Sequence, residues 1–274
     1  VVGGAGDNAA AAVGTGVVED GRAFATIGTS GVVFAHTDKL SIDPQGRVHT
    51  FCCAVPGAWH VMGVTLAAGQ SLKWYRDNFC DADKVEADKQ GVDPYDLMTA
   101  EAAKTPIGSN RLIYLPYLMG ERTPHLDPDC RGAFVGLSGM HTRYDLVRAV
   151  MEGVTFSLRD CAEILRGMGV QSDVILACGG GGSSAFWRQM MADILGCPVA
   201  TTISKEGPAL GVAILAGVGA GLYPSVPEAC RKIVGVNASQ APVAEHVAEY
   251  DKFYEIYRGL YPALKDSWHK LAEL

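Results

Sequence analysis

The stretch DVILACGGGGSSAFWRQMMADIL, residues 173–195, predicts the local structure around which the chain is arranged. Residues 174–177 form a short apolar run, which is typical of a strand covered on both faces. Four glycines at 179–182 remove every Cβ from the connection, and Ser183 or Ser184 can cap the helix that follows. A glycine loop that opens into a helix exposes backbone N–H groups at the positive end of the helix dipole, so the stretch predicts an anion or nucleotide site. The alternative is a tight strand-to-helix turn that needs glycine only for steric reasons.

Length and composition set the class of protein. The chain has 274 residues, of which 48% are hydrophobic and 19% charged, enough to bury a sizeable core. A net charge of −7 argues against a nucleic-acid partner. No apolar run is long enough to span a bilayer and no signal peptide is present, so we expect a cytoplasmic protein without a membrane partner. The eight cysteines form no CxxC pair, which favours reduced thiols over disulfides or zinc ligands.

The beginning of the chain resembles the interior of a domain. It starts at Val1, almost inside a glycine-rich turn, so we expect that an N-terminal portion is missing. Asp7 and Asn8 follow that turn and precede an alanine-rich helix. Asp7 is therefore either the N-cap of the helix or a carboxylate held on a strand-to-helix turn as a general base.

Two further glycine positions have a structural and a functional interpretation. Residues 23–36 predict two strands around a tight hairpin at 28–31, either a turn chosen for positive φ or a clamp for phosphate. Gly69 lies inside a helix predicted over 66–79, where it permits the close approach of a ligand or of another backbone segment. Lys73 lies one turn further along the same helix face.

The rest of the chain predicts an α/β fold with a mixed sheet. We expect strands at 48–55, 59–65, 112–116 and 199–203, and helices at 144–168, 209–220 and 248–274. The region 80–110 predicts a helix and loops, and the charged loop 119–137 is either simply solvated or part of a cleft. The helix at 209–220 is rich in glycine and alanine, so we expect it to pack closely against the sheet. An antiparallel meander followed by strand–helix units predicts one sheet with helices on its faces.

Several common catalytic motifs are absent from the sequence, which argues against the enzyme classes that use them. The chain contains no Walker P-loop, no GxSxG and no HExxH. Gly179 and Gly181, with Ser184 at the third small position, partly match a dinucleotide-binding loop, and Glu206 lies at a suitable distance to bind a ribose. A Rossmann-type oxidoreductase therefore stays an alternative, although its loop would lie unusually late in the chain.

Five stretches taken together resemble one family. They are VVGGAGDNAAAAVG, ATIGTSGVVFA, LPYLMGERTPHLDPDCRGAFVGL, GGGGSSAFWRQMMADILG and EGPALGVAILAG. In this order and spacing they resemble the C-terminal domain of sugar kinases of the FGGY carbohydrate kinase family, and within it the xylulokinase members most closely. The resemblance implies an actin-like ATPase (RNase H-like) fold, a mixed sheet with an antiparallel hairpin meander and flanking helices. It also implies that residues 1–274 are the nucleotide-binding half and that an N-terminal domain, which binds sugar and Mg²⁺, is absent from this chain.

The resemblance also implies roles for individual residues. Asp7 matches the catalytic base and, with Asn8, a contact to the sugar. The remaining matches are to the bound nucleotide: Gly28, Thr29 and Ser30 in the turn that faces the phosphates, Gly69 and Lys73 at contact positions on the next helix, and Gly180, Gly181 and Ser184 in the adenosine loop.

The implied reaction is the ATP-dependent phosphorylation of D-xylulose to D-xylulose 5-phosphate. Its small-molecule partners are ATP and the sugar, and the Mg²⁺ ligands are expected mostly in the absent domain, so no metal ligand is assigned here. A homodimer is compatible with this sequence. We expect the chain alone to lack kinase activity and to retain nucleotide binding. The alternatives are an FGGY kinase for another ketose or polyol, and a non-catalytic actin-like nucleotide-binding module, against which the retention of Asp7 argues.

Overall fold

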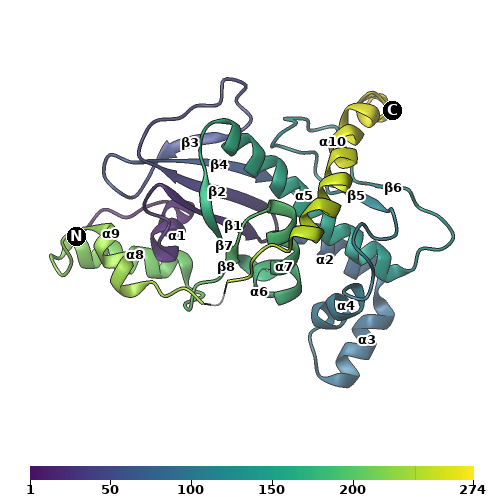
Figure 1. Cartoon of the computed structure of the whole chain (residues 1–274), viewed down its shortest axis with the longest axis horizontal. Helices are drawn as coiled ribbons and strands as arrows, with labels where there is room; N and C mark the ends of the chain where they lie inside the picture. Colours follow the sequence, from purple (N-terminus) through teal and green to yellow (C-terminus); the bar gives the residue numbers. More distant parts are fainter. Residues whose placement is uncertain (238) are drawn as a thin grey trace.

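A six-stranded mixed sheet forms the centre of the computed structural model, which describes residues 1–237 and 239–274 (Figure 1). The strand order is β3-β4-β2-β1-β7-β8, with bounds β1 (Gly21–Ile27), β2 (Gly31–Thr37), β3 (His49–Cys52), β4 (Trp59–Thr65), β7 (Ser172–Cys178) and β8 (Val199–Ala200). Strands β1 to β4 pair antiparallel, whereas β7 is parallel to both β1 and β8. The predicted mixed sheet is confirmed. The Rossmann alternative is wrong, because four of the six strands form an antiparallel meander.

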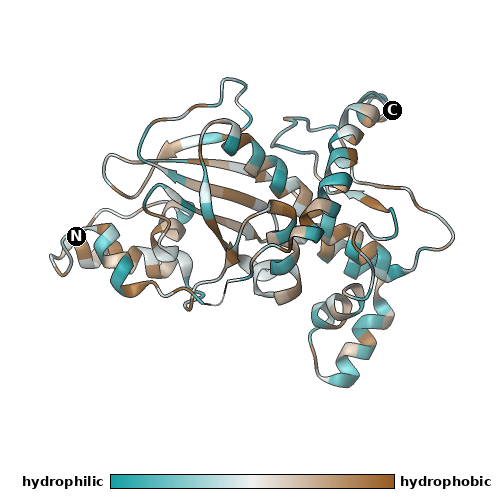
Figure 2. Cartoon of the chain, in the orientation of Figure 1, coloured by the Kyte–Doolittle hydropathy of each residue, from teal (hydrophilic) through white to brown (hydrophobic). Residues whose placement is uncertain are grey.

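Both faces of the sheet are covered, which explains the apolar strands. In β1, Ala23 and Ala25 pack into the main core with the long helix α5 (Arg143–Gly167), while Phe24 packs on the other face with α1 (Asp7–Thr15). This alternation follows from the period of two residues in a strand. In Figure 2 the central strands are coloured mainly as hydrophobic, whereas hydrophilic and hydrophobic positions alternate along the outer helices.

The other elements lie around this centre. They are α2 (Gly69–Phe79), α3 (Asp81–Gln90), α4 (Pro94–Ala102), α6 (Gly179–Ser183), α7 (Ala185–Leu195), α8 (Gly207–Gly219), α9 (Val226–Ile233), α10 (Ala244–Ala272) and a small antiparallel pair of β5 (Ile113–Leu115) with β6 (Ala133–Val135). The region 80–110 thus forms two helices, α3 and α4, and α9 was not predicted. Within the described residues, no helix has the length and apolar character needed to cross a bilayer, and all eight cysteines are free thiols.

Helix α8 packs against α1 and not against the sheet, so the predicted helix–sheet contact is wrong. A Cβ on Gly14 would lie 1.8 Å from the carbonyl oxygen of Gly207, and one on Gly211 would lie 1.8 Å from that of Ala10. These glycines allow the two helix backbones to touch, which larger side chains on either helix would prevent. The contact places the beginning of α8 beside α1, the helix that starts at Asp7 (Figure 1).

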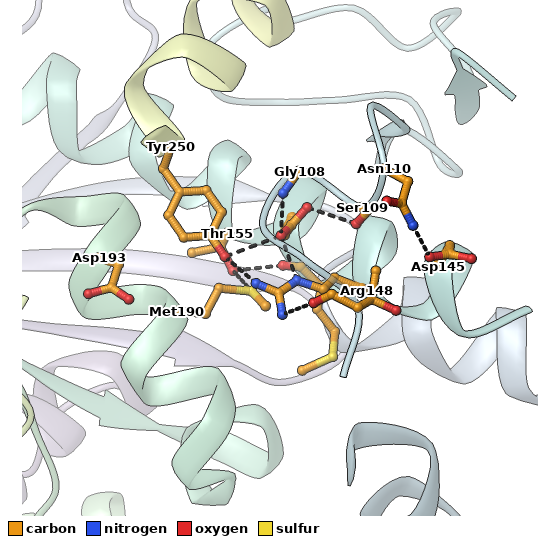
Figure 3. Close-up of polar contacts among 12 residues, drawn as sticks. Gly108, Ser109, Asn110, Asp145, Arg148, Thr155, Met190, Asp193 and Tyr250 are labelled. Atoms are coloured by element: carbon orange, nitrogen blue, oxygen red, sulfur yellow. Dashed lines mark hydrogen bonds and ion pairs between the residues drawn. The ribbon is translucent and has the colours of Figure 1, made fainter. Parts of the chain in front are cut away.

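A buried ion pair on α5 joins three parts of the chain (Figure 3). The Nε of Arg148 donates to Oε1 of Glu152 at 2.8 Å, and its Nη2 donates to the hydroxyl of Tyr250 on α10 at 2.9 Å. Oε1 of Glu152 also accepts from the N–H of Gly108 at 3.1 Å, and its Oε2 accepts from the hydroxyl of Ser109 at 2.8 Å. The pair therefore holds α10 and the loop before β5 against α5.

That loop needs such support because its backbone is left-handed at consecutive positions. Gly108, Ser109, Asn110 and Arg111 have φ of 74°, 49°, 56° and 72°. Three of them carry side chains, for which this conformation costs free energy. The side chain of Asn110 donates to Asp145 at 2.8 Å, so α5 holds the loop at a second point.

A buried carboxyl on α5 lines a hollow of about 620 Å³ beside α10, to which the loop 119–137 contributes Pro124 and His125. Asp160 is 8% exposed, and its Oδ1 accepts from the hydroxyl of Tyr254 at 2.7 Å. Burial raises the pKa of Asp160 from 3.8 to about 7. A carboxyl with a raised pKa in the folded state favours folding when it is protonated, so its contribution to stability is lost as the pH rises through this range.

We therefore expect Asp160→Asn to gain stability relative to the unmodified chain as the pH rises from about 4 to about 7, by an amount on the order of a few kcal/mol. The amide keeps an acceptor for Tyr254 but cannot ionise. Denaturant unfolding of both proteins across this pH range measures the difference between their free energies of unfolding. The contributions of the other titrating groups are the same in both proteins and cancel in this difference. A difference that does not change with pH would contradict the expectation.

Candidate functional site

Two glycine segments meet at one edge of the sheet because their strands are parallel. β1 and β7 are in register, with Thr26 opposite Cys178, so the β1–β2 turn and α6 both begin at the carboxyl ends of these strands. A Cβ on Gly179 would lie 2.6 Å from the carbonyl oxygen of Ile27, and one on Gly181 would lie 2.5 Å from the side chain of Ile27. Glycine is therefore required here so that α6 can rest on the end of β1.

The predicted glycine loop is instead a short helix. Residues 179–183 form α6, and Ser184 then accepts from the N–H of Trp187 at 3.3 Å as the N-cap of α7. Of the two capping candidates, Ser184 is thus confirmed. Arg188 donates to the carbonyl oxygens of Gly182 and Ser183, at 2.9 and 2.8 Å, which stabilises the carboxyl end of α6.

A first hollow of about 410 Å³ collects residues from four separate segments. Its lining includes all of the predicted nucleotide contacts except Ser30: Gly28, Thr29, Gly69, Lys73, Gly180, Gly181 and Ser184. Ser30 lies in the same turn but does not line the hollow. The apolar part of the wall comes from side chains such as Leu72 and Trp187. The structure thus brings these residues together, and their role as nucleotide contacts stays a prediction.

The hairpin turn and Gly69 have structural reasons for their residue types. Neither Gly28 nor Gly31 has a positive φ, so the interpretation of a turn chosen for positive φ is wrong. Gly69 is the first residue of α2 rather than an interior residue. Its N–H donates to the carbonyl oxygen of Gly28 at 2.7 Å, and a Cβ atom on Gly69 would lie 2.5 Å from the same oxygen. This contact confirms that Gly69 permits the close approach of another backbone segment, which is one of its two interpretations.

The ammonium group of Lys73 is already paired. Its Nζ donates to Oδ2 of Asp77 at 2.7 Å, and Asp77 also accepts from Arg76 at 2.6 Å. Both partners are substantially exposed, so the pair contributes little to stability and Lys73 can exchange this carboxylate for another anion.

Helix α4 contributes lining residues that the sequence did not indicate. Asp93, Tyr95, Asp96 and Thr99 line the first hollow together with the glycine segments. Asp93 is the N-cap of α4 and accepts from the N–H of Tyr95 at 2.8 Å. Asp93 followed by Pro94 is a helix-start signal, but nothing local places this helix at the hollow.

A second hollow of about 740 Å³ adjoins the first and contains Asp7 and Asn8. Gly180 and Ser183 line both hollows, so α6 separates them. The second hollow also has two cationic side chains in its wall, Arg188 and Lys205. A small molecule next to Asp7 would therefore lie on the other side of α6 from one in the first hollow.

Asp7 is the first residue of α1 and not its N-cap, which is Gly6. The interpretation of Asp7 as the N-cap is therefore wrong. The side chain is exposed, and within the part of the chain that the structure describes its Oδ1 accepts a hydrogen bond from its neighbour alone, the N–H of Asn8 at 2.8 Å. A carboxylate that makes no other hydrogen bond in the described residues is a group that can accept the proton of a hydroxyl placed beside it.

The charged loop 119–137 lines neither of these two hollows. Asp127 is 5% exposed and accepts from the hydroxyl of Tyr261 at 2.8 Å, and it pairs with His269 at 2.9 Å, so this loop is tied to α10. Of the two interpretations of the loop, simple solvation is wrong for these buried charges.

Comparison with known proteins is consistent with this arrangement. The family model of the C-terminal domain of the FGGY family of carbohydrate kinases matches residues 23–220. The chain belongs to the FGGY family of carbohydrate kinases. A xylulose kinase of Bacillus subtilis is 38% identical over 97% of this chain and 51% of its own length. The FGGY chain thus spans about half the length of the curated relatives it matches.

Solved structures of two family members align equally well. A ligand-bound xylulose kinase from Lactobacillus acidophilus has a TM-score of 0.86 at 30% identity, covering 96% of this chain and 51% of that chain. A gluconate kinase from the same organism has a TM-score of 0.84, also at 30% identity, with the same coverage. The actin-like ATPase fold predicted for this FGGY domain is confirmed.

Proposed function

We propose that this chain is the nucleotide-binding half of an ATP-dependent sugar kinase that converts D-xylulose and ATP into D-xylulose 5-phosphate and ADP. One observation carries the proposal: the predicted nucleotide contacts other than Ser30, from three separate segments, line one hollow, and Asp7 lines the hollow next to it across α6. Phosphoryl transfer needs this arrangement, because it depends on positioning two substrates and neutralising charge.

In this proposal ATP occupies the first hollow with its phosphates toward the β1–β2 turn. Within the described residues, the backbone N–H groups of Thr29 and Ser30 have no hydrogen-bond acceptor in the protein, so they are available to phosphate oxygens. The apolar wall and the polar side chains of α4 then face the nucleoside.

Asp7 acts as the general base. Its carboxylate accepts the proton of the sugar hydroxyl as that oxygen bonds to the γ-phosphorus of ATP, and the bond from this phosphorus to the bridging oxygen of ADP breaks. Asn8 contacts the sugar beside it. A carboxylate is a sufficient base here because the hydroxyl proton can leave late in the reaction.

Within the described residues, no group of three potential metal ligands lies in either hollow. The group of three potential metal ligands among the described residues, Asp127, Asp129 and His269, lies outside both hollows. Asp127 already accepts from Tyr261 and pairs with His269 through one oxygen, and it accepts from the N–H of Asp129 through the other. We therefore propose that the ligands of the Mg²⁺ that accompanies ATP belong to the half of the kinase outside this chain.

The identity of the sugar rests on the similar proteins and not on residues of the two hollows. Xylulose kinases of Bacillus subtilis, Staphylococcus epidermidis and Escherichia coli are each 38% identical to this chain, and this likeness favours D-xylulose. A gluconate kinase aligns equally well, which makes another sugar the second candidate. The non-catalytic module is less favoured, because a binding module has no need of the exposed carboxylate of Asp7 in the second hollow.

ADP release by the protein that contains both halves, measured with D-xylulose, D-gluconate and glycerol, tests the proposal. We expect turnover with D-xylulose. Turnover with another sugar alone would change the substrate, and no sugar-dependent ADP release would reject the kinase. The chain of 274 residues by itself should bind ADP without turnover, and measurable turnover would contradict its assignment as one half.

A further inference from the structure

Glu121 is a buried carboxylate that lines neither hollow. It is 2% exposed, in the loop between β5 and β6. Its Oε2 accepts from the hydroxyl of Thr65 at 2.5 Å, and its Oε1 accepts from the N–H groups of Leu66 and Arg122 at 2.9 and 2.8 Å. Thr65 and Leu66 are the end of β4 and the residue after it, so this side chain fixes the point where the chain leaves the sheet.

The neighbouring Thr123 attaches the same loop to β4. Its N–H donates to the carbonyl of Val64 at 3.0 Å, and its hydroxyl accepts from the N–H of Val64 at 3.1 Å. β3 pairs with β4 only as far as Met62. Thr123 therefore supplies the hydrogen-bond partners that β3 does not provide for the backbone of Val64. Glu121 is thereby held at the end of β4.

The connection that follows β4 holds the turn of the first hollow. The N–H groups of Ala68 and Gln70 donate to the carbonyl of Thr29 at 3.0 and 3.2 Å, and Gly69 donates to Gly28 at 2.7 Å. Three successive backbone groups thus fix the carbonyls of Gly28 and Thr29. The position of this turn therefore depends on the position of the β4–α2 connection.

We propose that Glu121 is a positioning residue for the turn at Gly28 and Thr29, acting through the β4–α2 connection. This inference rests on the proposed function, in which that turn faces the phosphates of the nucleotide. Glu121 does not touch the nucleotide. It accepts from two donors at the beginning of the connection, the hydroxyl of Thr65 and the N–H of Leu66. Without this carboxylate the connection, and the turn that the connection holds, are free to shift.

The test is ADP binding to this chain, measured by calorimetry for Glu121→Ala, Glu121→Gln and a matched control, Asp145→Ala. Asp145 is also buried and also accepts three hydrogen bonds, from the N–H and hydroxyl of Thr142 and from Asn110, but it lines neither hollow. We expect Glu121→Ala to weaken ADP binding about tenfold. Glu121→Gln should bind nearly normally, because its amide oxygen still accepts from Leu66 and Arg122.

Asp145→Ala should lose stability without losing affinity for ADP. Equal ADP affinity in Glu121→Ala and the unmodified chain would overturn the inference, as would equal weakening by Asp145→Ala. If Glu121→Ala does not fold, Thr65→Val removes one of the three donors without changing the side-chain shape, and normal ADP binding by it would overturn the inference. Absence of ADP binding in the unmodified chain would instead reject the proposed nucleotide site itself.

Discussion

Asp7→Asn is expected to lower the turnover of the sugar kinase reaction by about 10³-fold, within the range of general-base contributions. The amide cannot accept the proton of the attacking hydroxyl, yet it has the size and position of the carboxylate. Affinity for ADP should not change, because Asp7 lines the second hollow and not the first. Coupled ADP release by the protein that contains both halves measures the turnover, and ADP titration measures the affinity.

Asp81→Asn is the matched control for this variant. Asp81 is also an exposed carboxylate at the first position of a helix, α3, and the substitution changes the net charge equally. Because Asp81 lines neither hollow, its variant should keep full turnover. Full turnover in Asp7→Asn would show that the base is another group, and equal losses in both variants would show that the effect is only one of charge.

Glu152→Ala is expected to cost about 3–5 kcal/mol of the free energy of unfolding. Arg148 and Glu152 are 5% and 2% exposed, so the substitution leaves a guanidinium group buried without its carboxylate (Figure 3). It also removes the acceptor of Gly108 and Ser109, which lie in the left-handed loop. Denaturant unfolding of this chain at neutral pH measures the loss.

Two further variants make that prediction specific. Glu163→Ala on the same helix removes a partly exposed carboxylate that pairs with Arg159 and Arg166, and it should cost less than about 1 kcal/mol. The double substitution Arg148→Met with Glu152→Leu removes both charges and should recover much of the loss. A cost for Glu152→Ala as small as that for Glu163→Ala would show that the buried pair does not stabilise the fold.

The amino-acid sequence was sufficient for features that depend on neighbouring residues. Alternation in β1 places Phe24 and Ala25 on opposite faces of a sheet. A hydroxyl cap was expected at Ser183 or Ser184, and Ser184 begins α7. Five short stretches were together sufficient for the family and the mixed sheet. These signals are short-range, because strand periodicity and helix capping are set within a few residues.

Tertiary structure alone decided how separate segments meet. The sequence does not show that α8 rests on α1, that Tyr95 and Asp96 from α4 line the first hollow, or that Glu121 is bound to Thr65, 56 positions away. In each case the residue type suits several environments: glycine permits contact with any backbone, and a charged side chain is usually solvated. Only the packing of the whole chain removes water from Glu121 and brings it the donors of Thr65 and Leu66, so its place in the molecule follows from the fold and not from its local sequence.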